Sequence, residues 1–241
     1  MGVIIYNGKS SKDFGLEVWQ APEYQIPERD YETVHIEGRS GDLVIDRGSF
    51  KNVTRSYTIS FGKDKEKYFT PVAKKVAEWL HSSTGYARLE DSYEPEYYRQ
   101  AIVYKSLSIT NLYEKAGYLT IEFYCKPQRF LKAGEKVITV ESGTTKSIHN
   151  PTVFASRPII KIYGSGFGTV TINDKTVTIN SIDGYLTIDC ELMEVYKDDD
   201  NCNSKIILDG NEFPKLTEGT NSISFSGSIT SLEVTPKWWT I

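Results

Sequence analysis

Histidine, cysteine and long apolar runs are scarce in this chain of 241 residues. The histidines are His35, His81 and His149, and the cysteines are Cys125, Cys190 and Cys202. An odd set of cysteines without C-x-x-C spacing argues against a disulfide framework or a Cys-rich metal site, so we expect folding in a reducing cytoplasm. No run approaches the ~18–20 apolar residues of a membrane helix, so no membrane insertion is expected. The first residues also lack the basic and apolar regions of a secretory signal.

A strong charge of one sign is missing as well. The formal net charge is −4, and the Lys and Arg residues are scattered without a basic stripe. Nucleic-acid binding depends largely on neutralising phosphates, so this pattern argues against a dedicated nucleic-acid binder.

Recognised catalytic motifs are absent from the sequence. There is no G-x-S-x-G elbow, H-E-x-x-H helix, Walker loop or Rossmann fingerprint. The G-x-G-x-G of residues 164–168 leads into a Thr/Val/Ile strand rather than a helix, so these glycines are interpreted as turn or bulge positions. We therefore predict neither a cofactor nor an enzymatic activity.

Two acidic patterns in the sequence offer alternatives to this interpretation. Asp189 and Glu191 are two residues apart on a predicted strand, and a carboxylate pair of this kind could serve a glycosidase. Hydrogen bonding at the strand end is the favoured alternative. Asp199, Asn201 and Asn203 have the first spacings of a calcium loop, but the Gly and Glu required later in such a loop are missing, which favours a solvated loop.

Alternation of apolar and polar residues dominates the rest of the chain. Residues 56–61 and 118–124 show it clearly, and TVTIN occurs twice, at 169–173 and 176–180. Asn173 and Asp174 tolerate the left-handed backbone of a tight turn, so a hairpin is predicted there. The sequence predicts a mainly β protein.

One segment has helical periodicity instead. Apolar side chains recur at three- and four-residue steps from Phe69 to Leu80. Thr70 is a predicted cap, Pro71 suits the first helical position, and Gly85 follows the end. The pattern predicts a helix over about 66–83, packed on a sheet with Trp79 in the core.

Turn-forming and small polar residues concentrate at 141–151. We place a domain boundary near 130–150, with an N-terminal domain at 1–135 and a C-terminal domain at 136–241. The last predicted strand contains Trp238 and Trp239, which must point to opposite faces. Trp238 is in phase with Leu232 and Val234, so we expect it to be buried, with Trp239 outward.

Several stretches of the second half resemble one protein family. The stretches are RPIIKIYGSGFGTVTIN, GYLTIDCELMEVY, NEFPKLTEGTNSISFSG and VTPKWWT. The matching positions are Pro158, Gly164, Gly166, Asp189, Glu191, Phe213, Pro214, Leu216, Gly219, Asn221, Ser226, Gly227, Pro236 and Trp238. In this order they are similar to the distal tail protein (Dit) family of long-tailed, non-contractile phages of Gram-positive hosts. The first half matches more loosely, through Gly38, Arg39 and Gly41.

This resemblance implies a specific fold and role. It implies an N-terminal β-sandwich with one α-helix and a long hairpin, whose copies form a hexameric ring, and a C-terminal galectin-like or CBM-like β-sandwich. It places the protein in the virion, at the distal end of the phage tail, after assembly in the host cytoplasm. The implied partners are the major tail protein, the tail-associated lysin or tip protein, a receptor-binding protein in some phages, and the tape measure or DNA passing through the lumen.

Tyrosines concentrate at 96–124, beyond what one sandwich normally buries. Because tyrosine is enriched at protein interfaces, we predict a contact between subunits there. The residues are Tyr97, Tyr98, Tyr104, Tyr113, Tyr118 and Tyr124. The main alternative to an assembly protein is a module that recognises a host cell-wall saccharide, with Trp239 as the candidate contact.

Overall fold

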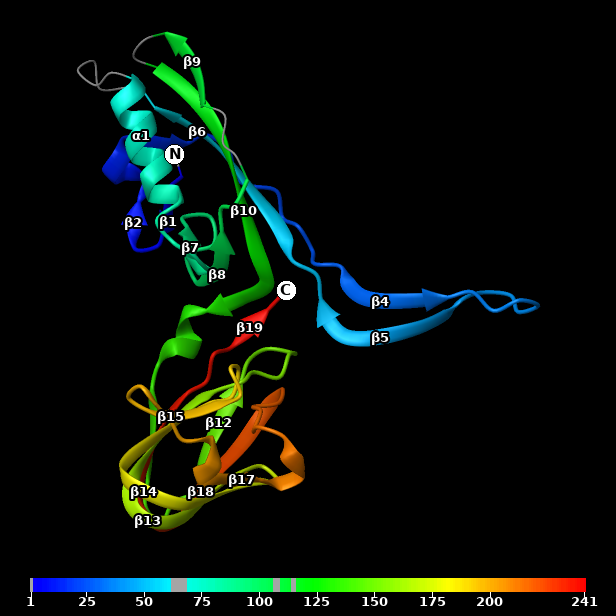
Figure 1. Cartoon of the computed structure of the whole chain (residues 1–241), viewed down its shortest axis with the longest axis vertical. Coiled ribbons are helices and arrows are strands. Elements are labelled where there is room, and N and C mark those ends of the chain that lie inside the picture. Colours follow the sequence, from blue (N-terminus) through cyan, green and yellow to red (C-terminus); the bar gives the residue numbers. More distant parts are fainter. Residues whose placement is uncertain (1, 62–68, 106–108, 114–115) are drawn as a thin grey trace. The chain divides into compact units, whose positions relative to one another are not determined.

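The computed structural model describes residues 2–61, 69–105, 109–113 and 116–241 (Figure 1). It is mainly β-structure, as the alternation of the sequence predicts. The chain forms two compact units, residues 1–129 together with Ile241, and residues 130–240. The division falls a few residues before the predicted boundary at 135. Within the described ranges, no helix is long and apolar enough to cross a bilayer.

A single curled sheet forms the frame of the first unit. Its strands run in the order β2-β1-β7-β8-β10-β6-β3, with β9 also paired to β10. The bounds are β1 (Ile4–Tyr6), β2 (Lys9–Ser10), β3 (Leu16–Val18), β6 (Val53–Phe61), β7 (Ala87–Asp91), β8 (Tyr97–Ile102), β9 (Ile109–Tyr113) and β10 (Ala116–Leu131). Gly2 and Val18 form an antiparallel bridge, in which Gly2 N–H donates to Val18 O over 3.1 Å. The two sides of the curled sheet therefore meet.

The predicted helix is present as α1 (Phe69–Leu80). Val76, Trp79 and Leu80 are buried, as the apolar stripe predicts. The Trp79 indole N–H donates to Tyr6 O over 2.9 Å, and Phe14, from the short 3-10 helix η1 (Ser11–Phe14), stacks on its ring. Phe69 and Thr70 both lie within the described part of the helix, so Thr70 is not at the N-cap as predicted. One face of α1 thus completes the core of the first unit.

The alternation in β6 and β10 also has the predicted result. Tyr57 and Ile59 of β6 and the apolar residues of β10 from Leu119 to Phe123 point into one core. The side chain of Phe61, which the same alternation includes, lies outside the described part of the chain.

A separate two-stranded sheet belongs to the first unit. It consists of β4 (Arg29–Val34) and β5 (Leu43–Phe50), and Figure 1 shows it extending away from the main sheet of that unit. We call residues 29–50 the arm. Nearly all of its side chains are exposed on both faces. A hairpin of this kind has little core of its own to stabilise it.

The second unit is built from long, bent strands. Their order is β11-β18-β13-β14-β15-β16, with β12 paired to β18 and β17 paired to β14. The bounds are β11 (Ile138–Glu141), β12 (Lys146–Asn150), β13 (Ile159–Ile172), β14 (Lys175–Asp189), β15 (Glu194–Lys197), β16 (Asp200–Asn201), β17 (Ile206–Leu208) and β18 (Gly219–Thr235). The short β19 (Trp239–Thr240) follows in the chain and is not a strand of this sheet. Both ends of β13 and β14 contribute to one core, so the strands fold over on themselves as a β-sandwich.

Two turn predictions are confirmed in this unit. Asn173 has φ 54° and joins β13 to β14 through the predicted two-residue turn. The glycines at 164–168 lie inside β13, where the pairing with both neighbouring strands shifts register. They are bulge positions, and they mark the bend of the sheet.

Gly227 and Gly184 offer a matched pair of substitutions at this bend. Both have positive φ, which costs a residue with a Cβ atom roughly 1–2 kcal/mol. A Cβ on Gly227 would also lie 2.6 Å from Phe167 O, whereas a Cβ on Gly184 meets nothing within 4 Å. We expect Gly227→Ala to lower the free energy of unfolding by clearly more than Gly184→Ala, in denaturant titrations of both variants. Equal losses would show that backbone conformation alone matters at this bend.

Candidate functional site

The predicted family motif forms a hydrogen-bonded centre in the second unit. Asn221 is fully buried, and its Oδ1 accepts from Thr217 N (2.8 Å) and Asn173 Nδ2 (2.9 Å). Its Nδ2 donates to Thr217 O (2.8 Å) and Gly219 O (3.0 Å). Asn221 therefore fixes the β13–β14 turn and the start of β18 together, which is a structural role.

Other motif residues serve the same packing. Leu216 exchanges two backbone hydrogen bonds with Ser156, each of 2.9 Å, and Ser156 Oγ donates to Pro236 O. Pro158 O accepts from Cys190 N over 3.1 Å. The motif positions that are buried or packed against the core are Pro158, Asp189, Phe213, Pro214, Leu216, Asn221, Pro236 and Trp238. The motif thus describes how this sandwich folds, and Gly164, Gly166, Gly219 and Gly227 supply its bends and turns.

Trp238 is buried, as predicted, with 5% of its surface exposed. Its carbonyl accepts from Leu131 N over 2.8 Å, and a Cβ on Gly134 would lie 2.4 Å from Trp238 N. Only glycine at position 134 permits this close approach.

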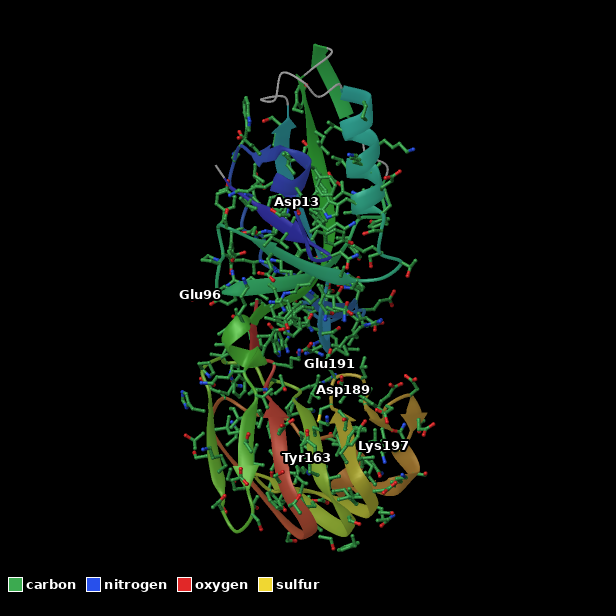
Figure 2. All side chains as sticks on the ribbon, turned by 90° about the vertical axis from the view of Figure 1, so that its left-hand side faces the viewer. Asp13, Glu96, Tyr163, Asp189, Glu191 and Lys197 are labelled. Atoms are coloured by element: carbon green, nitrogen blue, oxygen red, sulfur yellow. The ribbon has the colours of Figure 1, made fainter. Side chains whose placement is uncertain are left out.

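Asp189 and Glu191 lie at the end of β14 (Figure 2). Asp189 Oδ1 accepts from Glu191 N and Leu192 N, both over 3.0 Å, and its side chain is buried. Glu191 is exposed and lies 3.5 Å from Arg157. The predicted strand-end hydrogen bonding is confirmed, and the Asp189 carboxylate is committed to the turn. In the described chain, no group of three or more His, Cys, Asp or Glu side chains is arranged to hold a metal ion.

Trp239 is half-buried. Its indole N–H donates to Ala155 O over 3.0 Å, and its ring stacks on Phe154 with centroids 4.5 Å apart. One ring face and the N–H group, both of which a saccharide would use, are therefore already engaged within the second unit.

The predicted interface tyrosines differ in accessibility. Tyr104 and Tyr118 are 60% and 44% exposed, and Tyr104 contacts Tyr124 edge-on. Tyr98 is buried, and the Arg88 guanidinium lies over it, 3.8 Å from the centre of the Tyr98 ring. Tyr98 therefore packs within its own subunit and is not available for a contact between subunits. Two further residues complete the set: Tyr97, which lies against Arg129, and Tyr113, whose side chain is outside the described part of the chain.

A buried ionic cluster in the first unit was not foreseen from the sequence. Arg55 Nη2 lies 2.9 Å from Asp91 Oδ2 and 2.8 Å from Glu94 Oε2, and the Arg55 and Asp91 side chains are only 5% exposed. Tyr57 OH donates to Asp91 Oδ2 over 2.5 Å. Arg99 and Arg129 lie at 3.4 and 2.7 Å from Glu94. Scattered charges on separate strands give no periodic signal, so only the fold shows that they meet.

Electrostatics within this cluster favour its charged state. Burial pushes the pKa of Asp91 upward, but the hydrogen bond from Tyr57 and the positive charge of Arg55 outweigh it and lower the pKa below its usual value. Burial is also the main cause of the raised pKa of Tyr57, which remains a neutral donor. The cluster therefore ties β6 to the end of β7 through charge.

The arm carries an unusual set of exposed side chains. Its exposed apolar residues are Tyr31, Val34, Ile36, Leu43, Val44 and Ile45. Between them lie the ion pairs Arg29–Asp46 (2.6 Å) and Arg47–Glu32 (2.9 Å). The run Leu-Val-Ile at 43–45 was the available signal, because consecutive apolar residues in a strand must face both sides.

Comparison with known proteins shows a similarity in fold to one solved structure. No family profile and no curated protein sequence matches this chain. The structure matches the crystal structure of SPP1 Dit (gp 19.1) over 100% of both chains, with a TM-score of 0.75 and 12% sequence identity. The chain has the Dit fold. The resemblance predicted from the motifs is therefore confirmed in three dimensions.

SPP1 Dit is described as a paradigm of the hub adsorption apparatus in phages that infect Gram-positive bacteria. The Dit fold accounts for the predicted mainly β architecture with a single helix in the described chain. At 12% identity the shared feature is the arrangement of strands, and not a set of functional side chains.

Proposed function

We propose that this protein is a structural component of the distal end of a phage tail. Six copies form a closed ring that joins the tail tube to the tip. The major tail protein binds one side of the ring and the tail-associated lysin or tip protein the other, with the tape measure or DNA passing through the lumen. A receptor-binding protein is a further partner of its outer surface. The Dit fold over the whole chain is the observation that carries the proposal.

The arm supports assembly independently of that likeness. A two-stranded hairpin with apolar side chains on both faces is marginal when it is alone in water. A ring uses one interface repeated around the axis, so each subunit must offer two complementary patches. The arm, with the exposed Tyr104 and Tyr118, provides candidate contacts for such an interface.

Native mass spectrometry of the purified chain tests the ring directly. Six copies of the 27.3 kDa chain should give a species of about 164 kDa. A monomer at micromolar concentration would contradict a ring that forms from this chain alone, and the same measurement with the major tail protein added would then decide the proposal.

The double variant Val44→Ser/Ile45→Ser tests the arm within that ring. These side chains lie on opposite faces of an exposed hairpin, so their loss should leave the fold intact and convert the ring into monomers. Val137→Ser, at an exposed apolar residue of the second unit, is the matched control and should keep the ring. A ring of unchanged mass in the double variant would rule out the arm as a subunit contact.

A further inference from the structure

Charged side chains link the two strands of the arm. The contacts are Glu28–Lys51 (3.0 Å), Arg29–Asp46 (2.6 Å), Glu32–Arg47 (2.9 Å) and His35 Nδ1–Asp42 Oδ1 (3.1 Å). They are spread from the residues that border the arm to the end of the hairpin beyond Val34 and Leu43. Each contact joins a residue before the hairpin turn to a residue after it. The arm is therefore closed by charge at several points along its length.

The most extensive of these contacts lies at a bulge in the arm. Arg29 faces Phe50 in the strand pairing. Two residues later Tyr31 faces Asp46, so β5 has extra residues over this stretch. Asp46 Oδ2 accepts from Arg29 Nε (3.0 Å) and Nη2 (2.6 Å), and Asp46 Oδ1 accepts from Gly48 N (2.8 Å). One carboxylate thus holds both strands together with the backbone of the bulge.

The Glu32–Arg47 pair lies on the other face of the arm. Glu32 faces Ile45 in the strand pairing, one position along from the pair of Tyr31 and Asp46. Since successive side chains of a strand point to opposite faces, Glu32 and Asp46 lie on opposite sides. Each face of the arm therefore has a charged contact between its strands, beside exposed apolar side chains such as Ile45.

Charged contacts of this kind matter more in the arm than in a domain with a core. An exposed ion pair contributes little to the stability of a domain, and salt screens it. None of residues 29–50 is buried, so burial of apolar surface does not order the arm. A two-stranded hairpin without a core is close to the balance between the paired and the separated state. Small charge contributions therefore decide how often its strands are paired.

We propose that the cross-strand charges keep the arm folded before another surface covers it, so that ionic strength controls the order of the arm. When salt screens the pairs, the strands separate more often and the apolar side chains lose their fixed positions. A folded arm loses less conformational freedom on binding than a disordered one. In the proposed ring, on which this consequence alone rests, salt then weakens a subunit contact whose apolar side chains are not themselves screened.

Hydrogen–deuterium exchange of the full chain, read at the amide groups of β4 and β5, tests this inference. Glu32→Arg places two positive side chains together, and should speed exchange about threefold or more. The charge-swapped double variant Glu32→Arg/Arg47→Glu restores the pair in the opposite sense, and its exchange should return to that of the parent chain. Raising NaCl to about 1 M, where the screening length is about 3 Å, should bring the parent and Glu32→Arg together.

A second comparison tests the bulge. Asp46→Ala removes the hydrogen bonds to Arg29 and Gly48, and should speed exchange at the amide groups beside the bulge about threefold or more. Asp30→Ala is the matched control, because Asp30 Oδ2 accepts a longer hydrogen bond from Ser49 Oγ (3.3 Å), and its exchange should stay close to that of the parent. The melting temperature of every variant should be unchanged, since the arm lies outside both cores.

Two results would overturn the proposal. One is unchanged exchange in Glu32→Arg, which, if the ring were lost as well, would assign Glu32 to the subunit contact instead. The other is a charge-swapped chain that exchanges as fast as Glu32→Arg. The native mass of each chain is measured alongside. The expected order of exchange rates is the same in a ring and in a monomer, so a monomeric parent chain would contradict the ring and leave this test valid.

Discussion

Asp91→Asn is expected to destabilise the first unit by about 3 kcal/mol, because it removes one of the two carboxylates that pair with the buried Arg55 guanidinium and leaves only Glu94 to balance it. In either orientation the amide also places its N–H group against other donors, either Tyr57 OH and Arg55 or the backbone N–H groups of Tyr93 and Glu94. Chemical denaturation measures the effect, followed by tryptophan fluorescence in the Trp238→Phe/Trp239→Phe background, where Trp79 of the first core and the exposed Trp19 remain.

Asp46→Asn is the matched control for this substitution. Its pair with Arg29 is exposed to solvent, so the denaturation midpoint should hardly change. If both variants lost the same stability, burial of the ionic cluster would not be the cause.

Lowering the pH should destabilise the first unit by protonating the Asp91 carboxylate. The folded-state pKa of Asp91 is lowered, so its contribution to stability is present above the unfolded value of about 3.9 and is lost as pH falls through the folded pKa. We expect the stability of the first unit to fall below about pH 4, and Asp91→Asn to show a flatter dependence there.

Trp238→Ala is expected to lower the stability of the second unit by about 3–5 kcal/mol, the usual cost of deleting a buried indole. The cavity forms where Gly134 approaches the Trp238 backbone, and the hydrogen bond at Leu131 holds this backbone in place, so collapse around the cavity is restricted. Thermal unfolding followed by calorimetry should show the loss in one of two transitions, since each unit has its own core.

Trp239→Ala provides the comparison for the neighbouring position. It removes the stacking on Phe154 and one hydrogen bond, which together contribute about 1–2 kcal/mol. A larger loss from Trp239 than from Trp238 would contradict the assignment of Trp238 to the core.

Most of the correct predictions from the sequence rest on the regular spacing of apolar residues. Trp79 and Leu80 lie three and four residues after Val76, which is helical spacing. Leu119 and Phe123 belong to an alternating strand pattern. Each could therefore be assigned to a core from the sequence alone. Asn173 marked a turn because few residues accept its backbone conformation. These signals depend only on residues close together in the chain, so they can be recognised in a single sequence.

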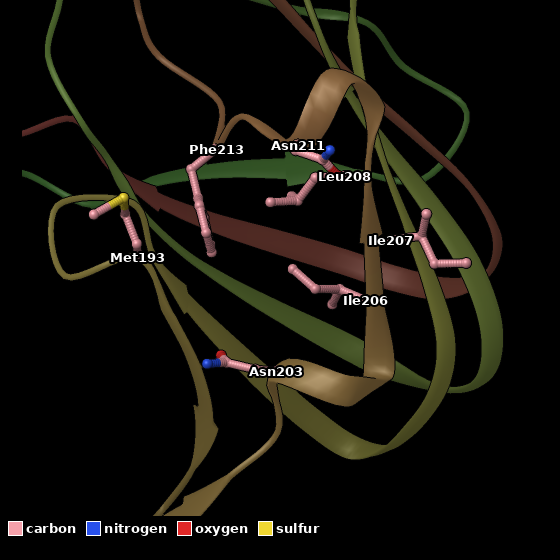
Figure 3. Close-up of a pocket in the computed structure, with 7 residues that line it drawn as sticks. All are labelled: Met193, Asn203, Ile206, Ile207, Leu208, Asn211 and Phe213. Atoms are coloured by element: carbon pink, nitrogen blue, oxygen red, sulfur yellow. The ribbon is translucent and has the colours of Figure 1, made fainter.

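Features that depend on residues far apart in the chain could not be predicted in this way. Arg55, Asp91 and Arg129 are separated by dozens of positions and have no shared spacing, yet they belong to one cluster that is connected through Glu94. An open cavity of about 350 Å³ beside Met193 in the second unit (Figure 3) likewise depends on where β17 lies against the turn after β14. Such sites are properties of the tertiary fold.

The exposure of the arm has an evolutionary consequence. Because side chains such as Val44 and Ile45 contribute little to the fold of their own subunit, substitutions there escape selection for monomer stability. In the proposed ring they are constrained instead by the subunit surface that they contact. We therefore expect residues 29–50 to diverge in step with the contacted surface, so that paired substitutions between the two would identify that surface in a collection of related sequences.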